Sequence, residues 1–348
     1  MEPEAKENNE IKMPDVSRLI ISGAPHYHSP DEIRGIMFMV VLALLPACLA
    51  GIWHFGIRAL WIMLLTVTSA VAWEVLANKV MRQKLSVGDG TAILTGLLLA
   101  MNLPPTVPEW VCVLGAFIAI VLGKMVYGGM GYNPFNPALV GRVALLLGLP
   151  SIMTRFVPPM HSVWDWCSAA NTVTQATPLV LTHATPHTRA EIVVDYMDLF
   201  IGHCSGCIGE TCFLALLAGG IFLICLNLIR WQVPVCYIGT VFIITAIAHR
   251  VSPSAYATPL SHVLSGGLAL GAFFMATDMV TTPLSRAGSV VFAVGCGIIT
   301  SVIRLWGSYP EGVSFSILIM NALTPLIDKA TAGHPFGTVR TAAQEVGK

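Results

Sequence analysis

The stretch "TAILTGLLLAMNLPPTVPEW", residues 91–110, joins an apolar run to three closely spaced prolines. Proline has no amide hydrogen and its ring clashes with the preceding turn, so a helix entering this stretch ends before Pro104. The apolar residues 90–103 give a helix of about fourteen residues, which at about 1.5 Å per residue is roughly 21 Å long. Because a membrane core is about 30 Å thick, the stretch predicts a broken, tilted or re-entrant helix.

The composition places this helix in a membrane. The chain has 348 residues, of which 55% are hydrophobic and only 11% charged, and its mean hydropathy is +0.73. These values indicate an all-α polytopic membrane protein. The 19 basic and 19 acidic residues cancel, so no overall field favours a nucleic-acid partner. The opening "MEPEAKENNE" lacks the basic and apolar regions of a signal peptide, and we expect the N-terminus to stay in the cytoplasm.

Apolar stretches bounded by proline, glycine or charge recur ten times, which predicts about ten transmembrane helices. They cover residues 36–53, 59–77, 90–103, 109–127, 136–149, 211–228, 233–249, 262–277, 289–306 and 313–328. The third and the fifth are short.

The distribution of Lys and Arg predicts the topology. With the N-terminus inside, thirteen of these residues, Lys124 among them, fall on the cytoplasmic side and five on the outer side, while Arg142 lies inside the fifth span. The positive-inside rule then places both termini in the cytoplasm and the long central loop on the outer face of the cell membrane. The expected parts are a cytoplasmic segment 1–33, a membrane repeat 34–149, an extracytoplasmic loop 150–210, a second repeat 211–328 and a cytoplasmic tail 329–348.

A shift of 176 residues aligns the two sets of five spans and gives five identities between positions 86–106 and the second half. An odd number of spans in each copy predicts an inverted repeat with short or broken helices. The break at 101–110 then corresponds to "TDMVTTPLSR", residues 277–286, and Asn102 aligns with Asp278. Because such folds bind small ions where broken helices meet, Asp278 and Asn102 are candidates for an ion pathway.

Two polar segments of the central loop are candidates for chemistry. "NTVTQATPL", residues 171–179, is by local chemistry a turn or helix N-cap. "GHCSGCIGETC", residues 202–212, contains Cys204, Cys207 and Cys212, which could in principle bind zinc or iron; we predict no metal, because a structural site needs four converging ligands. Its glycines precede the sixth span, so its amides either face an anion or form a tight packing loop.

Charged residues within or near the spans are costly unless they are paired or hydrated. They are Glu74, Asp89, Arg142, Glu210, Asp278 and Glu311. Asp89 and Glu311 lie at span ends, where a position at the membrane interface would explain them. Arg142 requires a counter-charge in the protein or on a ligand.

Five motifs in order resemble the RnfD and NqrB family of flavin-carrying subunits of ion-translocating redox complexes, over about residues 30 to 330. They are "DGTAILTGLLLAMNLPPTVPEW" (89–110), "GYNPFNPALVGR" (131–142), "GCIGET" (206–211), "TDMVTTPLSRAG" (277–288) and "YPEGVSFSILIMNALTPLID" (309–328).

The resemblance implies covalent FMN, joined by a phosphoester bond to a threonine in a D-x-x-[ST]-G-A-T motif. Aligned with this chain, the motif makes Thr177 the attachment site, with Thr174 and Ala176 beside it. Asn171 and Gln175 replace the acid and the glycine. The resemblance also makes Gly206, Gly209, Glu210 and Thr211 candidates for flavin contact, and allows a second, non-covalent flavin such as riboflavin. Trp164 and Trp166 either stack on the flavin or lie at the membrane surface.

The implied function is that of a membrane subunit of an Rnf-type complex, which passes electrons between ferredoxin and NAD while moving Na⁺ or H⁺. Such a subunit relays electrons and has no catalytic residues of its own, and no GxGxxG dinucleotide fingerprint occurs in the chain. Its implied partners are RnfA, RnfB, RnfC, RnfE, RnfG, a flavin transferase and the bilayer. The alternatives are an NqrB-like subunit of a Na⁺-pumping NADH:quinone reductase, whose N-terminal region is longer, and a small-solute transporter or channel without a redox role.

Overall fold

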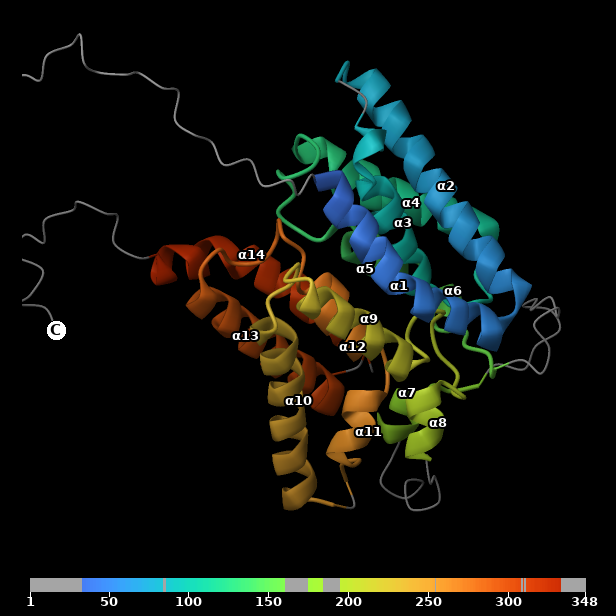
Figure 1. Ribbon diagram of the computed structural model, residues 1–348. Helices are drawn as coiled ribbons and strands as arrows, with labels where there is room; N and C mark the ends of the chain where they lie inside the picture. Colours follow the sequence, from blue (N-terminus) through green and yellow to red (C-terminus); the bar gives the residue numbers. More distant parts are fainter. Residues whose placement is uncertain are drawn as a thin grey trace, which may run out of the picture. The chain divides into compact units, whose positions relative to one another are not determined.

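The computed structural model describes residues 33–83, 86–159, 175–183, 195–253, 255–307, 309 and 311–332 (Figure 1). Within these ranges the chain is helical and contains no strand. The first half contains α1 (Ile33–Phe55), α2 (Ile57–Val80), η2 (Val87–Asp89), α3 (Thr91–Met101), α4 (Glu109–Phe117), the π-helix η3 (Ile118–Leu122), η4 (Met125–Tyr127), α5 (Pro137–Gly148) and α6 (Pro150–Met153). The central loop contains α7 (Pro178–His183) and α8 (Tyr196–Ile201). The second half contains α9 (Phe213–Cys225), α10 (Gln232–Val251), α11 (Pro259–Leu264), α12 (Leu268–Leu270), the π-helix η6 (Gly271–Met275), α13 (Arg286–Trp306) and α14 (Val313–Thr331).

The helices confirm the prediction of a polytopic membrane protein. Six are long and apolar enough to cross a membrane: α1, α2, the continuous segment Glu109–Tyr127, α10, α13 and α14. Three shorter apolar helices, α3, α5 and α9, occupy further predicted stretches. The remaining stretch, 262–277, is divided among α11, α12 and η6. Every predicted apolar stretch therefore contains helix, but not every one contains a full-length span.

The helix breaks lie where proline and glycine predict them. Helix α3 ends at Met101, and no helix resumes before Glu109, so the prediction from residues 91–110 is confirmed. In the second half, η6 ends at Met275 and α13 begins at Arg286, so the predicted interruption at 277–286 lies outside any helix up to its last residue. A further break between α11 and α12 was not predicted; Gly266 adopts a left-handed φ of 69° there, a conformation that glycine adopts without steric cost.

Equivalent helices of the two halves pack against equivalent partners. Helix α2 packs on α4 in the first half, and α10 packs on α13 in the second. The 176-residue shift aligns α2 with α10 and α4 with α13. Helices α1 and α9, also equivalent under this shift, contact each other. These contacts agree with the internal repeat inferred from the sequence.

Small residues allow the helices to approach closely. A Cβ atom added to Gly96 of α3 would lie 2.9 Å from the Cα atom of Val67 in α2. Small residues at helix contacts are typical of membrane bundles, where packing rather than water exclusion holds helices together. The short α3 is therefore fixed against α2, and its end at Met101 has a defined position beside the loop that follows α8.

Candidate functional site

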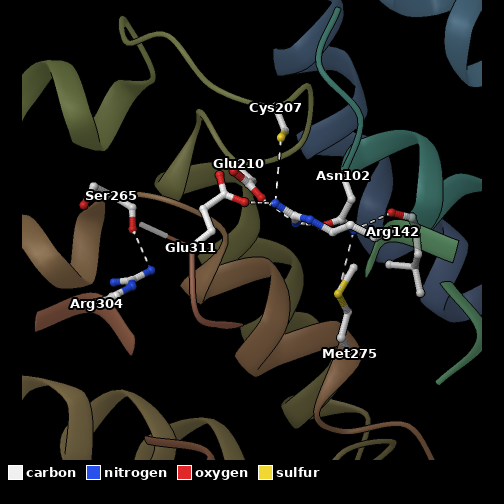
Figure 2. Close-up of polar contacts among 9 residues, drawn as sticks. Asn102, Arg142, Cys207, Glu210, Ser265, Met275, Arg304 and Glu311 are labelled. Atoms are coloured by element: carbon white, nitrogen blue, oxygen red, sulfur yellow. Dashed lines mark hydrogen bonds and ion pairs between the residues drawn. The ribbon is translucent and has the colours of Figure 1, made fainter. Parts of the chain in front are cut away.

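Arg142 is buried in α5 and forms the centre of the site. Helix α5 begins after Asn136, whose side chain accepts a hydrogen bond from the Ala138 amide at 3.1 Å, and Pro137 occupies its first turn. The Arg142 residue is only 4% exposed. Its guanidinium donates to Glu210 Oε1 at 2.7 Å and also to Asn102 Oδ1 and Glu311 Oε2 (Figure 2).

We call Arg142, Asn102, Cys207, Glu210 and Glu311 the guanidinium cluster. Its members come from the break after α3, from α5, from the loop before α9 and from the segment before α14. Asn102 Nδ2 donates to the Leu98 carbonyl at 2.6 Å, which leaves its Oδ1 atom to accept from Arg142. The counter-charge that Arg142 requires is present in the protein, and it comes from Glu210 in the loop before α9 and from Glu311 in the second half.

Glu210 is held tightly between two structural elements. Its side chain is 3% exposed, and a Cβ atom added to Gly267 would lie 2.6 Å from Glu210 Oε1. The preceding residues pair with the end of α3, because the Ile208 and Gly209 amides donate to the carbonyls of Leu103 and Met101 at 3.1 and 2.8 Å. Burial raises the pKa of the Glu210 carboxyl, and the Arg142 charge opposes that rise.

Glu311 is the more accessible acid of the cluster. Its side chain is 16% exposed, whereas that of its partner Arg142 is 5% exposed. The sequence places Glu311 at a span end, where a position at the membrane interface would have explained it. The structure corrects this interpretation, since the carboxylate points inward and forms an ion pair with Arg142.

A cavity of about 350 Å³ joins the guanidinium cluster to the segment that contains Thr177. Its polar lining includes Asn102, Arg142, Cys207, Glu311, Gln175 and Thr177, and its apolar and aromatic lining includes Leu146, Met153, Phe156, Val180 and Tyr309. Volumes of about 300–1,000 Å³ with an apolar lining and a few polar groups are typical of cofactor sites. The cavity therefore has the size and the lining to bind a small aromatic ligand.

Thr177 lies at the start of α7 and its side chain caps that helix. Its Oγ1 atom accepts a hydrogen bond from the Val180 amide at 3.3 Å, and the residue is 6% exposed. The Ser205 hydroxyl donates to the Ala176 carbonyl at 2.8 Å and so ties the loop before α9 to this segment. The capping interpretation from the sequence is confirmed. It does not conflict with an ester at Oγ1, because a capping oxygen accepts rather than donates.

The structure brings together some of the predicted site residues and separates others. Thr177, Ala176 and Asn102 line the cavity, whereas Gly206, Gly209, Glu210 and Thr211 are not among its lining residues. The Gly209 amide donates to a carbonyl, so it is not available to bind an anion. Other predicted residues lie outside the described ranges; they are Asn171, Thr174, Trp164 and Trp166.

Three possible metal ligands converge at the cysteine-rich loop, but two of them are ion-paired with Arg142. The ligand atoms of Cys207, Glu210 and Glu311 lie within 4.8 Å of one another, but the Arg142 guanidinium bonds to both acids and lies 3.9 Å from Cys207 Sγ. A cation bound there would be repelled by the guanidinium. Burial raises the pKa of Cys204 to about 12 and raises that of Cys207 as well, which disfavours the thiolates that bind metals.

The two candidates for an ion pathway line different cavities. Asp278 lines a cavity of about 90 Å³ with Lys124, Asn133 and Asn136, while Asn102 lines the larger cavity beside Thr177. Met275 lies between them, since its Sδ atom is 3.8 Å from Asn102 Nδ2 and its carbonyl accepts from Asn136 Nδ2 at 3.2 Å. Burial raises the pKa of Asp278. The two residues therefore do not form one cation site.

A second buried ion pair, which we call the lysine cluster, was only partly indicated by the sequence. Lys124 Nζ lies 2.9 Å from Glu74 Oε1 and donates to Thr91 Oγ1 at 2.6 Å, and Ser86 Oγ donates to the same Glu74 oxygen. Glu74 was recognised as a costly charge, whereas Lys124 was only counted among the residues on the cytoplasmic side. The structure buries the Lys124 side chain, which is 3% exposed.

Comparison with known proteins shows which family the sequence of this chain matches. Residues 20–337 match the family described as NQR2, RnfD, RnfE. A protein of Clostridium ljungdahlii, named as the D subunit of a proton-translocating ferredoxin:NAD(+) oxidoreductase complex, is 43% identical over 327 residues, which are 92% of this chain and 96% of the relative. The Na(+)-translocating counterpart of Acetobacterium woodii is 40% identical over 326 residues, with the same two shares. The D subunit of an ion-translocating oxidoreductase complex from Stutzerimonas stutzeri is 41% identical over 331 residues, 88% of this chain and 93% of the relative.

Proposed function

The chain belongs to the NQR2, RnfD, RnfE family, and from this premise we propose that it is the D-type membrane subunit of an ion-translocating ferredoxin:NAD oxidoreductase complex. Its relatives are named as subunits of ion-translocating oxidoreductase complexes, so the chain is a subunit of such an enzyme and does not act alone. Its partners in the proposal are RnfA, RnfB, RnfC, RnfE and RnfG, together with a flavin transferase.

The proposal includes covalent FMN, attached through a phosphoester bond to Thr177. The observation that carries it is the cavity of about 350 Å³ that Thr177 shares with Arg142 and Glu311. Its apolar and aromatic walls fit an aromatic ring system, and its polar groups fit the heteroatoms of such a ring. Bound FMN would supply one-electron transfer, the chemistry that an electron relay requires.

The residues of this chain would hold and shield the cofactor. The Thr177 hydroxyl is the atom that an ester requires, and its position at the start of α7 fixes its direction. Ser205 binds the Ala176 carbonyl and would keep the attachment segment against the cavity. Phe156 is 8% exposed and Met153 is 3% exposed, so these apolar walls would exclude water from the ring.

The proposed orientation of the chain in the membrane follows from the distribution of its Lys and Arg residues. Both termini are cytoplasmic and the loop 150–210 lies on the outer face of the cell membrane, since Lys and Arg concentrate on the other side. A second, non-covalent flavin such as riboflavin is part of the proposal without an assigned site. The cavity beside Asp278, at about 90 Å³, is smaller than a usual ligand pocket.

The coupling ion in the proposal is Na⁺ or H⁺, because relatives named for each ion have similar sequence identity to this chain. The proton-translocating and the Na(+)-translocating relatives are 43% and 40% identical to this chain. Asp278 and Asn102 remain the proposed residues of the ion pathway. They line two different cavities.

Fluorescence of the protein on a denaturing gel tests the attachment site. Expressed with a flavin transferase, the wild-type chain should give a fluorescent band under ultraviolet light, and peptide mapping should locate the added mass on Thr177. The Thr177→Val variant should be dark, because it lacks the hydroxyl. Thr154→Val is the matched control, since Thr154 lines the same cavity outside the motif, and its band should stay fluorescent. A dark wild-type band, or a fluorescent Thr177→Val band, contradicts the proposal.

A further inference from the structure

Two acids share Arg142, and the structure gives them different surroundings. Both Glu210 and Glu311 form ion pairs with the guanidinium (Figure 2). The buried Arg304 guanidinium also interacts electrostatically with both acids, so the group contains two carboxylates and two cations. Its effect on a ligand depends on which of the two acids faces the cavity.

Glu210 faces other protein segments. Its carboxylate lies close enough to Gly267, at the start of α12, that a Cβ atom there would meet Glu210 Oε1 at 2.6 Å. Glu210 does not line the cavity beside Thr177. Its contacts join the first half of the chain to the broken helix of the second half, which is a structural role.

Glu311 faces the cavity. It lines the same space as Thr177 and Arg142, and its side chain is 16% exposed, compared with 3% for Glu210. Arg142 is bonded to this carboxylate in the same wall, and apolar residues form much of the rest. Charge interactions in such surroundings are several times stronger than in water.

We propose that Glu311, held in place by Arg142, lowers the reduction potential of the flavin at Thr177, and that Glu210 is a structural counter-charge. This inference rests on the proposed function, because it needs the flavin in the cavity. Reduction increases the negative charge on a flavin, and a carboxylate nearby opposes that increase while a guanidinium favours it. Glu311 acts through its own charge and also by engaging Arg142, so both effects lower the potential.

Spectroelectrochemical titration of the purified complex tests the inference. Glu311→Gln removes the charge but keeps an oxygen for Arg142, and the midpoint potential of the covalent flavin should become more positive. Glu311→Asp withdraws the charge from the cavity by one methylene group, and it should give a smaller shift of the same sign. Glu109→Gln is the matched control: Glu109 is an acid with a 57% exposed side chain paired to Arg58, away from the cavity, and its loss should leave the potential unchanged.

The fluorescent band on the gel separates the two hypotheses. A dark band in the wild type means that the proposed attachment is wrong. A fluorescent band with a wild-type potential in Glu311→Gln overturns the inference alone. If Glu311→Gln does not accumulate as folded protein, a wild-type potential in Glu311→Asp overturns it. A shift in Glu109→Gln as large as that in Glu311→Gln also overturns it, because the effect would then come from net charge.

Discussion

The guanidinium cluster and the lysine cluster are both buried ion pairs, but they are built differently. Lys124 and Glu74 are one cation and one acid, and the side chains bonded to them belong to the first half alone. Glu74 Oε2 is buried without a hydrogen-bond partner. Arg142 is one cation with two acids, and its partners come from both halves and from the loop between them. The first cluster lies within one half, whereas the second joins both halves and lines a cavity of about 350 Å³.

This difference separates a structural ion pair from a candidate functional one. Buried charges cost free energy unless they are paired and hydrogen-bonded, so a balanced local pair is sufficient to position helices. A buried cluster that lines a cavity also presents charged groups to any ligand in that cavity. Arg142 and Glu311 line the cavity beside Thr177, so both would lie near the proposed flavin.

The largest expected effect comes from removing the shared cation. Arg142→Met removes the cation that is bonded to both acids, and we expect it to lower the free energy of unfolding by about 3–5 kcal/mol. Lys124→Met leaves only one acid without its partner and should cost less. Thermal unfolding of the detergent-purified protein measures both. Equal losses in the two variants would contradict the distinction between the clusters.

An intermediate effect tests whether the lysine cluster is completed locally. Ser86 Oγ donates to Glu74 Oε1 and accepts from Asn78 Nδ2 at 3.0 Å. Ser86→Ala removes a hydrogen bond to a charged group, and we expect a loss of about 1.5–3 kcal/mol. The same unfolding measurement checks it, with Thr68→Ala as the control, because the Thr68 hydroxyl bonds only to its own helix. A loss no larger than that of Thr68→Ala would show that Ser86 is not required.

The smallest effect concerns the loop that carries Glu210. A Cβ atom at Gly209 would lie 2.5 Å from Met101 Cβ, so Gly209→Ala must displace the loop or the end of α3. Such overpacking costs about 1–3 kcal/mol. Gly148→Ala is the control, since nothing lies within 4 Å of a Cβ atom there. An unfolding temperature for Gly209→Ala equal to that of Gly148→Ala would contradict the close packing.

Much of the fold was predictable because its causes are local. Proline spacing ended α3 near Met101, and apolar length predicted which stretches make long helices and which make short ones. The break at Gly266 was missed, since a left-handed glycine within an apolar run has no periodic signal. The burial of Lys124 was not predicted, because counting charges by loop does not show which side chains are buried.

The sequence by itself determined that this chain is a helical membrane protein, that helix breaks follow α3 and η6, and which threonine is the candidate for attachment. Only the tertiary structure decided the partners of Arg142. Asn102, Glu210 and Glu311 lie 40, 68 and 169 positions away from it along the chain. No periodicity or motif spacing links such distant residues. They meet because a guanidinium in a membrane interior requires oxygen partners, and the packing of both halves brings these oxygens to it.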